Sequence, residues 1–320
     1  MIQESLGAVV WSIRYTSAMA VTDTTLDWLL DADPAIRWQV MRDLTDEPAS
    51  AVARERSRVA REGWGARLLD LQAEDGNWGG GVYTPKWIST TYTLLLLRHL
   101  GIDPDDDRVR SVIDRVRDRV EMSGPYFDYS TETCITGMVL ALGSYFLEEA
   151  AEAPQPEHLL AIQREDGGWN CQVSSDRSSF HTTISVLEGL LEHDKAVGED
   201  AAVAEARQRA HEFLLERRLM YRLSDGELVN ERWLLMSFPP RWHYDVLRAL
   251  DYLADAGVEP DSRCDEAVEI IATKQLKDGT WPLQNRHAGK EHFAMEEGSG
   301  KPSRWNTLRA MRVLGWYGVG

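Results

Sequence analysis

Charged amphipathic segments alternate with more apolar segments along the chain. The charged segments, which we expect to face solvent because one side of each is polar, lie near residues 50–72, 105–120, 199–216 and 261–275. The more apolar segments lie near residues 35–44, 89–100, 130–142, 179–191, 241–248 and 303–315. Three of them begin at Ser89, Ser130 and Ser179, a residue type that caps helix N-termini. The pattern predicts an all-α protein in which apolar helices pair with charged ones.

One turn sequence, Gln-x-x-Asp-Gly-x-Trp, occurs three times, starting at Gln72, Gln163 and Gln275. Asp-Gly suits a tight turn because glycine adopts a positive φ without a Cβ clash. We expect the Gln to cap backbone groups and the Trp to fill the joint between neighbouring hairpins. The copies lie 91 and 112 residues apart, which leaves room for one degenerate copy in each gap, near residues 124–126 and 225–227.

Six such hairpins predict an α/α toroid with the apolar helices around a central cavity, and an open solenoid of the same hairpins is the alternative. Arg37-Trp38 near the start of the chain and Arg304-Trp305 near its end resemble each other, which favours a closed ring. We assign residues 23–320 to a single toroid domain. Residues 1–22 are interpreted as a disordered extension or a miscalled start.

Composition narrows the possible partners and the compartment. The 320 residues carry a net charge of −17, which disfavours nucleic acid or an anionic membrane as the main partner. Three cysteines at uneven spacing do not make a disulfide framework, which fits a reducing compartment. No apolar run approaches the roughly 18 residues of a membrane span. Ala18-Met19-Ala20 ends only a weak export signal, so we expect a cytoplasmic protein.

The three turns resemble the QW motifs of squalene-hopene cyclases and related triterpene cyclases, and the same ring of hairpins builds the β subunits of protein prenyltransferases. The resemblance implies a hydrophobic, isoprenoid-type substrate bound in a central cavity. The acid motif of class II cyclases, D-x-D-D, matches only residues 103–106, between an apolar helix and a charged one. We expect these carboxylates to point away from the cavity and to complement a helix dipole.

The resemblance to prenyltransferase β subunits extends to two short segments. Glu132-Thr133-Cys134 begins one apolar helix and Phe180-His181-Thr182 begins the next, 47 residues from Cys134 to His181. The family implies a catalytic zinc at Cys134, His181 and Glu132, which stands where the family has Asp, with an open position that activates a thiol or water. Cys171, in the turn ahead of His181, is a candidate extra ligand. The residue types also fit a buried thiol, a hydrogen-bonded core histidine and a carboxylate on a helix dipole.

Aromatic and basic residues gather near the starts of the apolar helices. We expect the aromatic side chains to ring the mouth of the cavity, or else to serve as packing between repeats: Trp38, Trp87, Tyr92, Tyr129, Trp242 and Trp305. Arg37, Arg241 and Arg304, with His243 as a further catalytic candidate, either converge into an anion site or pair with acidic neighbours. The bases that the family places before its zinc site are absent from residues 125–129.

Three functions follow. The first is a zinc-dependent prenyltransferase-like or terpenoid-cyclase-like enzyme, with a possible partner subunit or a homodimer. The second is a metal-free cyclase or lyase that uses Asp128, Glu132 or Asp245 as its acid. The third is a non-catalytic toroid that binds a lipid or another protein. Residues 287–304 form a polar connection that is either a lid over the cavity or an ordinary surface loop.

Overall fold

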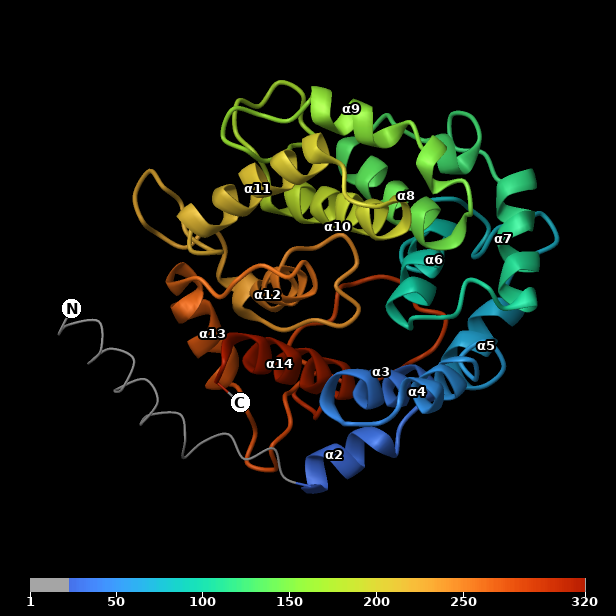
Figure 1. The fold of residues 1–320 in the computed structure, drawn as a ribbon, viewed down its shortest axis with the longest axis horizontal. Coiled ribbons are helices and arrows are strands. Elements are labelled where there is room, and N and C mark those ends of the chain that lie inside the picture. The colour runs from blue at the N-terminus through green and yellow to red at the C-terminus, as the bar shows by residue number, and fades with distance from the viewer. Residues whose placement is uncertain (1–22, 320) are drawn as a thin grey trace.

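The structure, a computed structural model, describes residues 23–319, and the predicted extension of residues 1–22 lies outside them. The described residues form an all-α ring of paired helices (Figure 1). The inner helices are α3 (Pro34–Leu44), α6 (Thr90–His99), α8 (Thr133–Phe146), α10 (Phe180–Val197), α12 (Val246–Asp255) and α14 (Arg304–Tyr317). The outer helices are α2 (Asp23–Leu30), α4 (Ala49–Arg56), α5 (Gly63–Asp70), α7 (Asp107–Arg119), α9 (Gln155–Ala161), α11 (Ala201–Glu216) and α13 (Asp265–Ala272).

The ring is closed where α14 packs against α3, so the first and last hairpins lie side by side (Figure 1). Arg312 of α14 forms an ion pair with Asp43 and donates a hydrogen bond to the Gln39 side chain at 2.8 Å. Arg304 donates to the carbonyl of Trp28 at 3.3 Å. These contacts confirm the predicted closed toroid and exclude the open solenoid.

The repeated turns have one geometry. The indole rings of Trp78, Trp169 and Trp281 are buried, and each donates its N–H to a helix carbonyl ten residues earlier, at 2.7–2.8 Å. Each Gln side chain donates to the carbonyl of the turn glycine, at 2.7–3.1 Å. Gln72 and Gln163 donate in addition to carbonyls of the next outer helix, α7 or α11. Each of these two turns therefore fastens one hairpin to the next.

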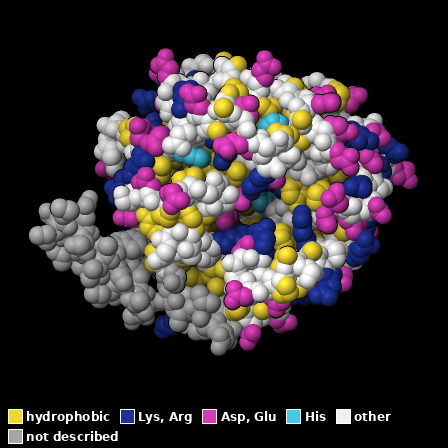
Figure 2. All heavy atoms as spheres, viewed as in Figure 1, with side chains coloured by type: hydrophobic (Ala, Val, Ile, Leu, Met, Phe, Trp, Pro, Cys, Tyr) yellow, Lys and Arg dark blue, Asp and Glu magenta, His cyan; other side chains and the backbone are white. Residues whose placement is uncertain are grey.

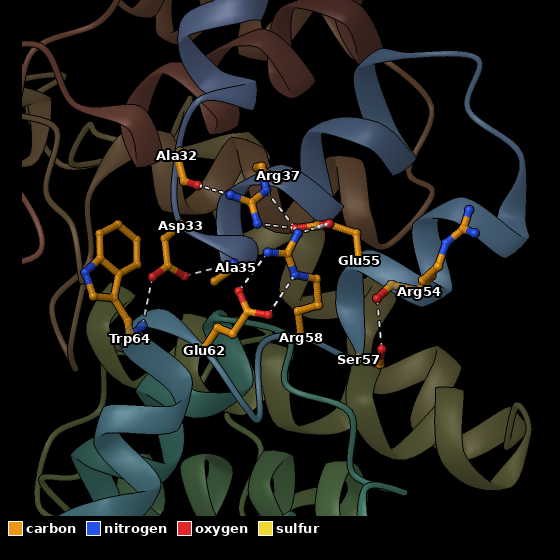
Figure 3. Close-up of polar contacts among 10 residues, drawn as sticks. All are labelled: Ala32, Asp33, Ala35, Arg37, Arg54, Glu55, Ser57, Arg58, Glu62 and Trp64. Carbon is orange, nitrogen blue, oxygen red and sulfur yellow. Dashed lines mark hydrogen bonds and ion pairs between the residues drawn. The ribbon is translucent and has the colours of Figure 1, made fainter.

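Two helices differ from the prediction. The segment 50–72 is divided into α4 and α5, because Gly63 adopts a φ of +64°. A Cβ at Gly63 would lie 2.0 Å from Oδ2 of Asp33, which accepts a hydrogen bond from the Trp64 amide (Figure 3). The inner helix expected from residue 241 begins only at Val246, since Arg241 has a φ of +60°.

Helices α8 and α10 lie so close together that two positions at their contact have room for glycine only. A Cβ on Gly189 would lie 2.4 Å from the carbonyl oxygen of Gly137, and a Cβ on Gly137 would lie 2.6 Å from that of Ser185. Glycine at both positions is therefore required for this helix contact.

Candidate functional site

A cavity of about 1080 Å³ lies inside the ring, at the C-terminal halves of the inner helices. Its lining includes the last turns of α3, α6, α10 and α12 and the second half of α14. Figure 2 shows basic side chains gathered near the centre of one face of the molecule, beside acidic ones. The sequence analysis expected the site at the N-terminal starts of these helices, whereas this cavity lies at their C-terminal halves.

The cavity wall is rich in charge. Its basic residues are Arg42, Arg56, Arg98, Lys195, Arg248, Arg309 and Arg312. Its acidic residues are Asp43, Glu47, Asp103, Glu188, Glu192, Asp251 and Asp255. Seven of each contrasts with 35 basic and 52 acidic residues in the whole chain. The cavity is thus more basic than the protein around it.

Ion pairs between helices hold much of this wall. Arg248 of α12 binds Glu188 of α10 through both guanidinium ends, at 2.8 and 2.7 Å. Burial alone raises the pKa of Glu188, but the charge and hydrogen bonds of Arg248 outweigh it and lower the pKa to about 2. Arg98 pairs with Glu192, and Arg309 pairs with Asp251 at 2.9 Å. Two of these pairs join helices that follow each other in the ring, and the pair of Arg98 with Glu192 joins α6 to α10, on either side of α8.

Trp38 and Arg56 form a different part of the wall. The guanidinium carbons of Arg42 and Arg56 lie 4.7 and 5.3 Å from the centre of the Trp38 ring, within cation–π range. Arg56 donates to the carbonyl of Gly101 at 2.9 Å and to the Tyr145 hydroxyl at 3.1 Å. Among residues 23–319, no carboxylate lies within ion-pairing distance of Arg56, so no acidic side chain neutralises the charge of Arg56.

Trp305 brings an unused donor to the cavity. Its ring stacks on Phe238 with 4.3 Å between centroids and an interplanar angle of 8°, and the side chain is 2% exposed. Its indole Nε1 has no hydrogen-bond partner among the described residues. A buried donor without an acceptor is costly unless a bound group supplies one.

The three arginines that were expected to form an anion site do not converge. Arg37 lies outside the cavity, where it binds Glu55 and the carbonyl of Ala32 (Figure 3). Arg304 contributes to ring closure, and Arg241 pairs with Glu291 at 3.6 Å beside Trp87. The interpretation in which each arginine has a local partner is therefore correct for Arg37 and Arg241, while Arg304 donates to backbone carbonyls.

Most of the predicted aromatic residues pack near the inner-helix starts rather than along the cavity. Only Trp38 and Trp305 of the six line it. Trp87 and Tyr92 are almost fully buried and meet edge to face at 4.7 Å, and Tyr129 accepts a hydrogen bond from the Glu132 amide. Trp242 stacks on His243, with centroids 3.8 Å apart. Burial favours the packing interpretation for Trp87, Tyr92 and Tyr129.

The long connection of residues 287–304 lies across the start of α6. The Trp87 amide and indole donate to the carbonyls of Lys290 and His287, at 2.7 and 3.0 Å. His292 contacts the Thr93 hydroxyl at 2.9 Å, and the carboxylate of Glu296 accepts from Ser303 at 2.6 Å. This segment covers the helix starts and does not line the cavity.

His181 and His243 lie close together, but their nitrogens are not arranged around a common point. Their ring centroids are 5.9 Å apart, and His243 stacks on His287 at 3.8 Å. His181 Nδ1 accepts the backbone N–H of Tyr244 at 2.7 Å. In the neutral ring this hydrogen bond places the proton on Nε2, so neither nitrogen offers a free lone pair. Burial lowers the pKa of His181 to about 4 and that of His243 to about 3.

The two cysteines of the predicted zinc site contact each other. The Cys134 backbone N–H donates to Cys171 Sγ at 3.2 Å. A hydrogen bond between the two thiols lowers the pKa of Cys171 to about 6 and raises that of Cys134. Glu132 is exposed, and its own amide is used by Tyr129.

A zinc ion does not fit this arrangement. In the part of the chain that the structure describes, no group of three or more His, Cys, Asp or Glu side chains is placed to hold a metal. The tautomer of His181 also removes the nitrogen that would bind it. We therefore derive no chemical step through zinc, and zinc content remains a prediction from the sequence.

None of the carboxylates chosen as a general acid lines the cavity. Asp128 and Glu132 are exposed. Asp245 is buried, and burial raises its pKa, but it caps α12 by accepting the Arg248 amide at 2.8 Å. In the D-x-D-D segment, Asp106 caps α7 as expected, whereas Asp103 does line the cavity, contrary to expectation.

Sequence reasoning missed the arginines of the cavity, although a local signal existed. Arg42 follows Trp38 by four residues, and Arg309 likewise follows Trp305 by four, in segments that otherwise resemble each other. Residues four apart lie on the same face of a helix, and Arg42 indeed lies over the Trp38 ring. The arginine four residues after each Trp therefore indicates the cavity wall, and the arginine directly before each Trp does not.

No family model matches the sequence, and no curated protein matches it. Among solved structures, the chain is similar to the type II terpene cyclase MstE from Scytonema, with 15% identity over 88% of each chain and a TM-score of 0.39. A variant of MstE in complex with geranylgeranyl dihydroxybenzoate matches at the same identity and TM-score, over 90% of this chain and 87% of that one. The likeness is to a terpene cyclase, as the repeated turns predict, and we draw no activity from it. Within residues 23–319, no helix is both long and apolar enough to cross a membrane.

Proposed function

We propose that the protein binds an anionic, partly hydrophobic small molecule of isoprenoid type in its central cavity. The observation that carries this proposal is a cavity of about 1080 Å³ whose lining includes Trp38, Trp305 and Arg56, a cation without a carboxylate partner in the described chain. Ligand sites are concave and combine apolar surface with a few placed polar groups. The size and the mixed lining both match this description.

The wall suggests how such a molecule is held. An anionic head group gains most next to Arg56, because guanidinium groups bind phosphate and carboxylate strongly and Arg42 is already paired with Asp43. The unpartnered indole N–H of Trp305 suits an oxygen elsewhere on the molecule. The hydrocarbon part covers the aromatic faces, where contact with water is lost.

Binding is tested by isothermal titration of the purified full-length protein with farnesyl and geranylgeranyl diphosphate, and with geranylgeraniol as the neutral comparison. Arg56→Met removes a hydrogen bond to a charged group, worth about 1.5–3 kcal/mol, and should weaken diphosphate binding about 10- to 100-fold. Arg37→Met is the matched control, because Arg37 precedes the same Trp but lies outside the cavity. Trp305→Phe keeps an aromatic side chain and removes the N–H together with part of the indole ring system.

Two results would count against this proposal. One is the absence of saturable binding for both diphosphates and the alcohol. The other is an equal loss in Arg56→Met and Arg37→Met, which would place the effect on the fold rather than on the cavity. Circular dichroism of each variant separates loss of binding from loss of structure.

Turnover is the second candidate function, favoured by the presence of His99 and Glu188 in the same wall. Burial lowers the pKa of His99 to about 3, so the imidazole is neutral at neutral pH and suits hydrogen bonding to a substrate better than proton abstraction. Product analysis by mass spectrometry, with and without a chelator, tests it. We expect any conversion to be insensitive to chelator, while binding without conversion identifies a carrier.

A further inference from the structure

Two cysteines from different hairpins meet at the N-terminal ends of α8 and α10. Cys134 lies in the first turn of α8, and Cys171 lies in the irregular segment between Trp169 and α10. The sulfur of Cys171 accepts the Cys134 backbone N–H at 3.2 Å and the Thr182 hydroxyl at 3.4 Å. Both cysteines are free and half-buried, so small reagents can approach them.

We propose that Cys134 and Cys171 are a redox-active pair that forms a reversible disulfide within the chain. The Cys171 sulfur lies 3.2 Å from the Cys134 backbone nitrogen, so the two sulfurs need only a short approach. Cys134 is held by a helix, while Cys171 belongs to a segment without regular structure that can adjust. The third cysteine, Cys264, is fully buried elsewhere in the core and takes no part.

Cys171 carries out the attack in this pair. The N-terminal N–H groups of a helix favour negative charge, and the Cys134 amide and the Thr182 hydroxyl both point at the Cys171 sulfur. Cys134 therefore acts as the resolving cysteine. The resemblance assigned these two residues to zinc, because the sequence does not show that they contact each other.

The reaction with glutathione disulfide balances without any other reagent. The Cys171 thiolate attacks one sulfur of glutathione disulfide, which forms a mixed disulfide and releases one glutathione thiolate. The Cys134 sulfur then attacks the Cys171 side of the mixed disulfide and releases the second glutathione. In sum, two protein thiols lose two protons and two electrons, and one glutathione disulfide becomes two glutathiones.

The new bond would join two segments that now touch only through weak contacts. It closes a covalent loop between positions 134 and 171 and ties the start of α8 to the segment that precedes α10. The pair lies outside the cavity lining. Its chemistry can therefore be measured whether or not the cavity binds an isoprenoid.

The experiment uses the full-length protein, reduced and then equilibrated in buffers of increasing glutathione disulfide to glutathione ratio. Free thiols are trapped with N-ethylmaleimide, and the peptides are mapped by mass spectrometry without reduction. We expect two of the three thiols to disappear together, a peptide pair linked through Cys134 and Cys171, and full reversal by dithiothreitol. The far-ultraviolet circular dichroism should stay that of the folded protein.

Variants distinguish the two roles. Cys134→Ser should leave Cys171 carrying one glutathione, whereas Cys171→Ser should leave Cys134 largely unmodified. Cys264→Ala is the matched control and should form the same linked peptide as the parent chain. If a variant fails to fold, the peptide map of the wild-type protein still tests whether Cys134 and Cys171 form a disulfide.

Two outcomes would overturn the proposal. In the first, Cys134 and Cys171 both remain alkylated at every ratio while the protein stays folded. In the second, oxidation gives only glutathione adducts or links between chains, which would mean that the two sulfurs cannot reach each other.

Discussion

The ion pair between Arg248 and Glu188 offers the sharpest test of the cavity wall. The two side chains are only 4% and 16% exposed, and they make two hydrogen bonds of 2.7 and 2.8 Å. Arg248→Met keeps a side chain of similar length and removes the charge. It leaves a buried carboxylate with its main counter-charge gone, the situation in which ion pairs matter most to stability.

The expected magnitude follows from the pKa of Glu188. That pKa falls from 4.5 to about 2 in the folded protein, and at about 1.4 kcal/mol per pKa unit the folded state favours the carboxylate by roughly 3 kcal/mol. Breaking a buried pair by removing one partner typically costs about 3–5 kcal/mol. We therefore expect Arg248→Met to lower the free energy of unfolding by about 3 kcal/mol at pH 7.

The assay is urea unfolding at pH 7, followed by both tryptophan fluorescence and circular dichroism. A second variant, Arg248→Met with Glu188→Leu, removes the stranded charge and should recover most of the loss. Arg61→Met is the control for a lost ion pair at the surface, since Arg61 is 65% exposed where it meets Asp106. Its cost should stay within about 1 kcal/mol.

The pH dependence gives a further check. The folded pKa of Glu188 is lowered, so its contribution is complete above the unfolded pKa of 4.5 and is lost as the pH falls toward 2. The gap between the parent and Arg248→Met should therefore narrow below pH 4.5. An unchanged urea midpoint in Arg248→Met, or a double variant no more stable than the single one, would refute this account of the wall.

Three further predictions concern the rest of the ring. Gly189→Ala should lower the free energy of unfolding by about 1–3 kcal/mol, because its Cβ would meet the Gly137 carbonyl at 2.4 Å. Gly143→Ala has room for the Cβ and should raise the free energy of unfolding by up to about 1 kcal/mol in the same urea assay. Burial, followed by neighbouring positive groups, lowers the pKa of His243 to about 3, so stability should fall as the pH drops from 6.5 toward 3, and a His243→Phe variant should show a shallower fall. Elemental analysis should find no stoichiometric zinc, because His181 already accepts a backbone hydrogen bond; one zinc per chain that is lost in His181→Ala would contradict this.

The parts of the fold that the sequence predicted well are those with local causes. A turn such as 72–78 contains its own Gln, Asp-Gly and Trp within seven residues, and all of its key hydrogen bonds but one lie within that hairpin. Helix α8 was recognisable because it has no charged residue and is buried on nearly all sides. Closure was predicted from the likeness of the two ends.

The site was harder to predict because its parts are distant in sequence. Glu188 and Arg248 are 60 residues apart and meet only because their helices are neighbours in the ring. His181 was assigned to zinc, yet its partner is an amide 63 residues away, which no local pattern reveals. Arg37 was a candidate for the anion site, but its guanidinium already binds the carboxylate of Glu55 on the next helix.

The seam between α3 and α14 also orders the events of synthesis. Asp43 leaves the ribosome long before Arg312, its partner across 269 positions. Until α14 has been made, the ring is open beside α3 and the cavity is only partly enclosed. Truncation just before α14 should therefore yield a chain that aggregates rather than a smaller working ring, because its first hairpin would keep an uncovered apolar side.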